Sequence, residues 1–261
     1  MTLFAILLSY NFDKAGESYR CNMVNKVEVM GIGLYNDTLR EAVEQAQSYL
    51  SEGVLHTIEN ISMEMLLDAQ KDKELAQVLK TLHMALIGEK EILSVVSDKG
   101  GTDLNVQKIA EIEENDFFFE LFKRIEQGGK NVFLLGETEE KLANCRARLT
   151  ERFPQIVIAG EYALDNCNGD WEAVVNHMNS TTPDVILSVL KSPMQEHFLW
   201  QNKEKINANI WYGLGEIGKR GRPRIYSFLQ GKLLMNRLKD GIHKYEAAKG
   251  REEDDLENRN H

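Results

Sequence analysis

Two adjacent polar side chains, Gln195 and Glu196, follow a proline after an apolar stretch and are the first candidates for chemistry. The surrounding sequence, PDVILSVLKSPMQEHFLW, spans residues 183–200. Pro193 fixes the backbone of a turn, and the residues after it can open a helix beside the end of a strand. A Gln side chain both donates and accepts hydrogen bonds, as recognition of a base edge or sugar hydroxyl requires, whereas an ionised Glu only accepts. The alternative is structural, since the helix dipole favours a Glu at a helix start.

Four glycines that each follow an apolar stretch form a second candidate feature: Gly136, Gly160, Gly213 and Gly215. Glycine at a strand end lets a ligand approach the backbone closely, while the N-terminus of the next helix favours phosphate. Turn geometry alone also explains a single glycine. The chain contains neither the G-x-G-x-x-G dinucleotide fingerprint after its first strand nor a P-loop motif, so no cofactor is expected.

Apolar strands that alternate with amphipathic helices must position these residues. Buried strands are expected at residues 131–137, 155–162, 183–190 and 208–216. Earlier in the chain we expect a short strand and turn in residues 26–37, strands in 54–60 and 84–92, and one helix over 109–127. This alternation predicts an α/β fold, a Rossmann-like, mostly parallel sheet with helices on both faces. Ligands of such sheets bind beyond the carboxyl ends of the strands, where the candidate residues gather.

The distribution of charge argues against nucleic acid as a partner. The formal net charge is −10, whereas phosphate contacts need a basic face. Residues 191–249 nevertheless hold twelve Lys and Arg against five Asp and Glu, about +7, which leaves about −17 for the remainder. This basic third of the chain could approach a nucleotide diphosphate or an anionic membrane surface, and a solvated basic face is the alternative.

The remaining composition predicts a cytoplasmic protein without a metal centre. The three cysteines form no C-x-x-C pair, and the six histidines show no H-E-x-x-H spacing. The opening residues, MTLFAILLSY, are apolar but lack the basic flank of a signal peptide, and residues 1–22 are interpreted as an added arm or a misassigned start. Since no stretch approaches the roughly 20 apolar residues of a spanning helix, any membrane contact is expected to be peripheral.

Three segments together resemble the second half of the WecG/TagA/CpsF glycosyltransferases, glycosyltransferase family 26. They are residues 131–162, 180–200 and 209–216, and with a weaker N-terminal half the resemblance runs from Lys26 to Lys239. The shared pattern is a strand ending in Leu-Gly, a Phe-Pro before the next strand, a Pro-Asp strand, a Gln-Glu turn and a Gly-x-Gly strand end.

The resemblance implies transfer of an N-acetylhexosamine, typically N-acetylmannosamine, from a UDP-sugar donor to a polyprenyl-diphosphate-linked acceptor at the inner face of the cell membrane. It implies no metal for catalysis. The matching positions that would surround the nucleotide sugar are Gly136, Gln195, Glu196, Gly213 and Gly215, with Asn60 at an equivalent strand end.

Several departures from the family pattern fall in its presumed site. The family's presumed general base is an Asp whose position here is taken by Lys90, or by Glu89 if the register moves by one. An ammonium near its normal pKa cannot accept a proton at neutral pH, whereas Glu89 can, as can Glu91 if the turn is rearranged. Exposed turn charges are the alternative interpretation of both carboxylates. Glu137 stands where the family has glycine, and with Glu216 it would repel a diphosphate unless basic residues compensate.

The departures leave two functions open besides an active transferase. One is a catalytically inactive homologue that binds a nucleotide sugar and acts as a regulator or scaffold, and the other is a domain for an unrelated small molecule. The expected organisation is an α/β domain over residues 23–230, a basic helical appendage over 231–250 and a disordered acidic tail over 251–261. Arg237 and Lys239 would serve membrane docking in the appendage, or that helix packs on its own domain. The aromatic stretch NDFFFELF is expected in the core, with an oligomer face as the alternative.

Overall fold

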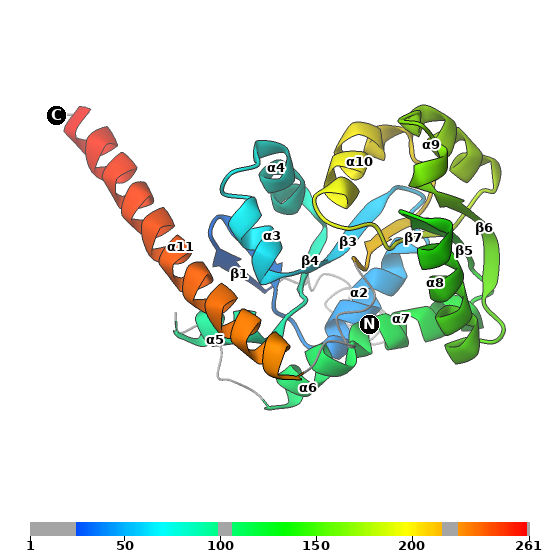
Figure 1. Cartoon of the computed structure of the whole chain (residues 1–261), viewed down its shortest axis with the longest axis horizontal. Helices are drawn as coiled ribbons and strands as arrows, with labels where there is room; N and C mark the ends of the chain where they lie inside the picture. Colours follow the sequence, from blue (N-terminus) through cyan, green and yellow to red (C-terminus); the bar gives the residue numbers. More distant parts are fainter. Residues whose placement is uncertain (1–24, 99–105, 216–223, 260–261) are drawn as a thin grey trace, which may run out of the picture.

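The computed structural model describes residues 25–98, 106–215 and 224–259, which form one mixed sheet with helices on both faces (Figure 1). The predicted arm over residues 1–22 lies outside the described residues. The strands are β1 (Lys26–Val29), β2 (Ile32–Tyr35), β3 (His56–Ile61), β4 (Met84–Ile87), β5 (Asn131–Gly136), β6 (Val157–Ala163), β7 (Val185–Ser188) and β8 (Ile210–Gly213). The helices are α2 (Leu39–Tyr49), α3 (Met63–Asp68), α4 (Lys73–Thr81), α5 (Lys90–Asp98), α6 (Val106–Glu114), α7 (Asp116–Gln127), α8 (Glu139–Arg152), α9 (Trp171–Ser180), α10 (Met194–Asn202) and α11 (Arg224–Arg259), with short 3-10 turns at η1 (Leu164–Asn166) and η2 (Lys203–Lys205).

The sheet confirms the predicted fold class. Its strand order is β1-β2-β4-β3-β8-β7-β5-β6, with β1 antiparallel to β2 and every other pair parallel. The strands β4, β5, β7 and β8 are almost wholly buried, as expected of a parallel sheet between two helical layers. The carboxyl ends of β3, β4, β7 and β8 therefore meet along one edge.

Two apolar cores lie on the two faces of the sheet. Helices α2, α7 and α8 cover one face, where Phe122 and Leu142 pack against Tyr212 and its neighbours. Helices α3, α4, α9 and α10 cover the other face, where Phe198 stacks on Trp211 at a centroid distance of 5.8 Å. Because neighbouring residues of a strand point to opposite faces, Trp211 and Tyr212 belong to different cores.

Two local features differ from the sequence expectation. The predicted single strand near the start is a hairpin, because Met30 and Gly31 adopt φ values of 54° and 80°, the left-handed pair that tight hairpin turns use. The predicted helix over residues 109–127 is two helices, α6 and α7, because Asn115 between them has φ 60°. Asn tolerates this conformation better than most residues.

Helix α11 is longer than the predicted appendage. It runs from Arg224 to Arg259, so its helical backbone includes residues 251–259, which the composition predicted to be disordered. Glu, Arg and Leu in that segment are good helix formers. Leu238 and Ile242 are buried against α3 and the neighbouring core, which anchors the middle of the helix on the domain. The C-terminal end of α11 extends away from the domain (Figure 1).

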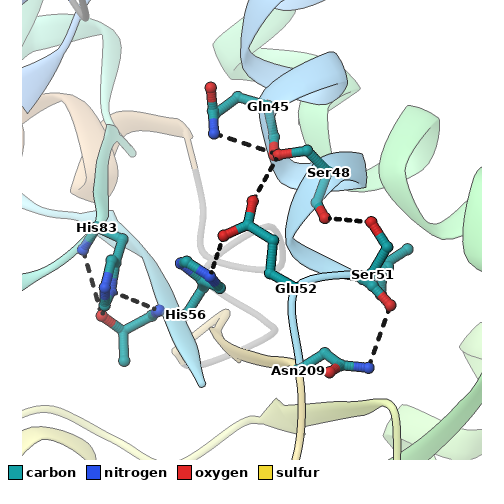
Figure 2. Close-up of polar contacts among 9 residues, drawn as sticks. Gln45, Ser48, Ser51, Glu52, His56, His83 and Asn209 are labelled. Carbon is teal, nitrogen blue, oxygen red and sulfur yellow. Dashed lines mark hydrogen bonds and ion pairs between the residues drawn. The ribbon is translucent and has the colours of Figure 1, made fainter. Parts of the chain in front are cut away.

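The amino end of β3 carries a separate polar and aromatic group, far along the strand from the edge described above (Figure 2). His56 stacks on Tyr49 with a centroid distance of 3.9 Å and lies 2.9 Å from Glu52, Nε2 to Oε2. His83 lies edge-on to His56 at 4.7 Å. Its Nδ1 accepts a hydrogen bond from the Thr57 backbone N–H at 3.1 Å.

Candidate functional site

A cavity of about 1710 Å³ opens at the carboxyl ends of β3, β4 and β8 and continues between α7 and α8. Binding pockets for single small molecules usually measure about 300–1,000 Å³, so this one has room for more than one such molecule. Its polar side includes Asn60, Ser62 and Ser192. Its apolar side, which we call the aromatic wall, consists of Phe117, Phe118 and Phe119 of α7.

Glu89 lies at the polar side of the cavity, directly after β4. Its Oε2 accepts a hydrogen bond from the backbone N–H of Met63, the first residue of α3, at 3.0 Å. This hydrogen bond fixes the orientation of the Glu89 carboxylate at the cavity wall. Gly88 brings the two segments together, since its N–H donates to the Ile61 carbonyl at 2.9 Å and an added Cβ would lie 2.9 Å from the same oxygen.

Lys90 and Glu91 also line the cavity, at the start of α5. The Lys90 ammonium forms an ion pair with Glu113 of α6, and that hydrogen bond raises the pKa of Lys90. Lys90 therefore stays protonated and is unsuited to accept a proton. Of the two predicted carboxylates, Glu89 is the one tied to the wall of the cavity by a backbone hydrogen bond.

Asn60 lies at the end of β3 and faces the cavity, as the sequence predicted. Its Nδ2 donates to Tyr212 Oη at 3.1 Å, which fixes the orientation of the amide. Burial raises the pKa of the Tyr212 hydroxyl, so the hydroxyl stays protonated.

Gln195 and Glu196 lie near the cavity but do not line it. Gln195 is 2% exposed and lies against Gly213, and Glu196 is fully buried beside Glu59, on the face of the sheet that α10 covers. The turn before them, Lys191 to Met194, does line the cavity. The two side chains predicted to contact substrate thus support that turn from beneath.

The predicted glycines have different roles in the structure. A Cβ on Gly136 would lie 2.8 Å from Leu142, so this glycine lets α8 pack on β5. A Cβ on Gly213 would lie 2.7 Å from Cγ of Glu59. Gly215 lines the cavity and has φ 70°, a conformation that favours glycine. Gly215 is therefore the predicted glycine whose backbone faces the ligand space.

Glu59 is the residue of this region that the sequence reasoning missed. It lies in β3 beside Gly213 and is fully buried. Burial raises the pKa of Glu59 well above its ordinary value, and the nearby charge of Glu196 raises it further. Burial also raises the pKa of Glu196. The sequence did hold a signal for this residue: a Glu inside the buried strand HTIENI is unusual and indicates a special role.

The basic side chains that line the cavity include Lys108, Arg148, Arg152 and Lys191. The Lys108 ammonium donates a hydrogen bond to the Asn36 carbonyl at 2.9 Å. The Arg152 guanidinium lies over the Phe119 ring, 5.2 Å from its centroid. Arg148 and Lys191 line the cavity without an ion pair to any residue that the structure describes. The acidic Glu137 also lines the cavity and pairs with Lys141. The basic residues between 216 and 223 lie outside the described residues.

The two appendage residues lie on different sides of α11. Arg237 lines the cavity, whereas Lys239 is exposed and does not. Leu233, beside them, is 63% exposed and also lines the cavity. Among the described residues, no helix is long and apolar enough to cross a membrane. Within the same residues, no three His, Cys, Asp or Glu side chains are grouped as metal ligands would be.

Comparisons with known proteins agree on one family. The model of the glycosyl transferase WecG/TagA/CpsF family matches residues 27–218. A protein of Staphylococcus aureus strain MW2 named N-acetylglucosaminyldiphosphoundecaprenol N-acetyl-beta-D-mannosaminyltransferase is 22% identical over 226 residues, which cover 82% of this chain and 85% of that protein. A protein of the same name from Bacillus spizizenii is 31% identical over 100 residues, 38% of each chain.

Proposed function

Because the chain belongs to the WecG/TagA/CpsF glycosyl transferase family, we propose that it transfers N-acetylmannosamine from a UDP-sugar to a polyprenyl-diphosphate-linked saccharide. The observation that carries this proposal is the Glu89 carboxylate at the cavity wall, held by the Met63 N–H at 3.0 Å. This carboxylate supplies a proton acceptor next to Lys90, the residue that aligns with the family's Asp.

Glu89 acts as the general base in this reaction. The acceptor hydroxyl oxygen attacks the anomeric carbon of the donor sugar while its proton passes to the Glu89 carboxylate. The bond from that carbon to the diphosphate oxygen breaks, and UDP leaves with the bonding electrons. A carboxylate at a cavity wall serves this role once the acceptor hydroxyl lies within hydrogen-bond reach.

Arg148 and Lys191 stabilise the diphosphate of the leaving group. Both line the cavity, from α8 and from the turn before α10 respectively. Cations fixed in a partly enclosed site stabilise developing negative charge without a cost of reorganisation. Asn60, Ser62 and Gly215 offer hydrogen-bonding groups for the nucleotide sugar at the same end of the cavity.

The second substrate occupies the rest of the cavity. A nucleotide sugar and an acceptor saccharide must both fit, which the volume of about 1710 Å³ permits. The aromatic wall provides an apolar surface for the first isoprene units of the acceptor. Arg237 and the exposed Leu233, four residues apart on one side of α11, then dock the protein peripherally on the inner face of the membrane, whereas Lys239 lies on the other side of the helix.

A catalytically silent homologue is the second candidate. It is favoured by Lys90, which stands at the expected place of the family's base and is held there by Glu113. In that case the cavity binds the nucleotide sugar without turnover.

The experiment that separates the two candidates measures both binding and transfer with the full chain. Calorimetry with UDP-N-acetylmannosamine tests binding. Incorporation of the labelled sugar into N-acetylglucosaminyl-diphosphoundecaprenol, dissolved in detergent, tests transfer. UDP-N-acetylglucosamine is the control donor, and a reaction without acceptor is the blank. Binding with acceptor-dependent transfer supports the transferase, binding without transfer supports the silent homologue, and no binding contradicts both.

A further inference from the structure

A group of polar side chains is sealed beneath Gly213, and the transfer chemistry leaves one of them, Glu59, without a role. Glu59 lies in β3 directly beside Gly213 of β8 and is 0% exposed. Gln195 and Glu196 reach the same place from α10, with exposures of 2% and 0%. Two carboxyl groups and an amide therefore share a space from which water is excluded, where an unpaired charge is costly.

The hydrogen bonding of this group is incomplete when both carboxyl groups are ionised. Gln195 Nε2 donates to Glu196 Oε1 at a long 3.4 Å. Within the described part of the chain, the buried polar atoms here without a partner are both Glu59 oxygens, Gln195 Oε1, Glu196 Oε2 and Trp211 Nε1. Two carboxylates can only accept hydrogen bonds, but one proton between them turns two unpaired acceptors into a donor and an acceptor.

We propose that Glu59 is a positioning residue, whose carboxyl group shares a proton with that of Glu196 and thereby fixes Gln195 and the turn before it. The inference rests on the proposed function, because that turn, Lys191 to Met194, lines the cavity assigned to the substrates. Gly213 supports the same assignment, since a Cβ there would collide with the Gln195 amide and would lie 2.7 Å from Cγ of Glu59.

Among the described residues, none of the side chains that interact with the pair carries a charge that could replace the proton. The side chains of Trp211, Gln195 and Ser192 interact with the pair and are all uncharged. His197, the next residue of α10, turns instead to Asp72 at the start of α4, with Nε2 and Oδ2 3.0 Å apart. Loss of the shared proton at alkaline pH therefore places two negative charges in contact. We expect this repulsion to shift the turn and to reduce sugar transfer.

The test compares the full-length parent with Glu59→Gln and Glu59→Leu over a range of pH. Glutamine keeps the shape of the side chain and supplies an N–H that does not titrate. We expect Glu59→Gln to retain transfer at neutral pH and to lose the alkaline fall in kcat/KM. Leucine removes the carboxyl group that shares the proton with Glu196 and leaves Glu196 Oε2 unsatisfied, so we expect a loss of kcat/KM on the order of tenfold. Thr57→Val, on the same face of β3 but away from the cavity, controls for a general loss of stability.

A second measurement does not depend on transfer. Infrared difference spectra between neutral and alkaline pH report a protonated buried carboxyl group through its C=O stretch. We expect this band in the parent at neutral pH and its loss in Glu59→Gln. Parent spectra without the band, or superimposable pH profiles of the parent and Glu59→Gln, would overturn the inference. Absence of transfer in the parent would instead contradict the proposed function and leave the spectroscopic test standing.

Discussion

The Glu89 carboxylate accepts a hydrogen bond from the Met63 backbone N–H at 3.0 Å, which joins the end of β4 to the start of α3 at the cavity wall. A carboxylate held in this way is oriented before substrate arrives. Preorganised groups of this kind contribute most to catalysis, because no free energy is spent on aligning them during the reaction.

Gly88 is required for that orientation. An alanine Cβ at this position would lie 2.9 Å from the Ile61 carbonyl oxygen, so the backbone must move. We expect Gly88→Ala to lower the free energy of unfolding by about 1–3 kcal/mol, the usual cost of overpacking, and to reduce transfer as Glu89 shifts. Thermal unfolding and transfer rates measure both effects. Gly250→Ala is the matched control, because nothing lies within 4 Å of a Cβ there; an equal loss in the two variants would refute this explanation.

The cations of the cavity are expected to act on the leaving diphosphate. Arg148→Gln should lower kcat/KM about tenfold or more, because one fixed charge that stabilises developing negative charge is lost. Arg146→Gln, on the same helix, removes a charge that pairs with Glu161 and does not line the cavity. Steady-state kinetics with the UDP-sugar donor varied distinguish the two. Similar kinetics for both variants would remove Arg148 from the site.

His83 is expected to destabilise the protein in acid. Burial and the nearby His56 and Lys side chains lower the pKa of His83, and its Nδ1 must be unprotonated to accept the Thr57 N–H at 3.1 Å (Figure 2). A group whose pKa is lower in the folded state contributes stability above its ordinary pKa of 6.5, and this is lost as pH falls through the folded pKa. Urea unfolding of the parent should therefore show a loss of stability below neutral pH that is smaller in His83→Asn. Parallel curves for the two proteins would exclude His83 as the cause.

The sequence was most informative where a hydrophobic run and the turn residues after it indicated the same strand end. The strands from residue 131 onward were predicted because continuous apolar runs end in glycine or proline. Asn60 was expected at the end of a strand and Glu89, through the family resemblance, in the turn after the next strand, and both line the cavity. The hairpin turn at Met30 and Gly31 was missed, since a methionine with positive φ has no sequence signature.

The burial of Gln195 and Glu196 could not be predicted from their types. Helix α10 buries Phe198 and Leu199 together with polar residues, so no polar face marks the side that meets solvent. Their positions depend on Glu59, which is 136 residues earlier than Gln195 and meets it only because β3 and β8 are neighbours in the sheet. Pairing of distant strands is a property of the topology, which local patterns do not encode.

The most direct test of the central claim is the transfer rate of Glu89→Gln with saturating donor and acceptor. Glutamine preserves the shape of the side chain and an oxygen that can accept the Met63 N–H, but it cannot take a proton from the acceptor hydroxyl. Glu172→Gln, at an exposed residue of α9, is the control. We predict a fall in kcat of about a hundredfold or more for Glu89→Gln with donor binding retained, the usual contribution of a general base. A kcat of Glu89→Gln equal to that of the parent would contradict Glu89 as the general base and leave Glu91 as the remaining predicted carboxylate.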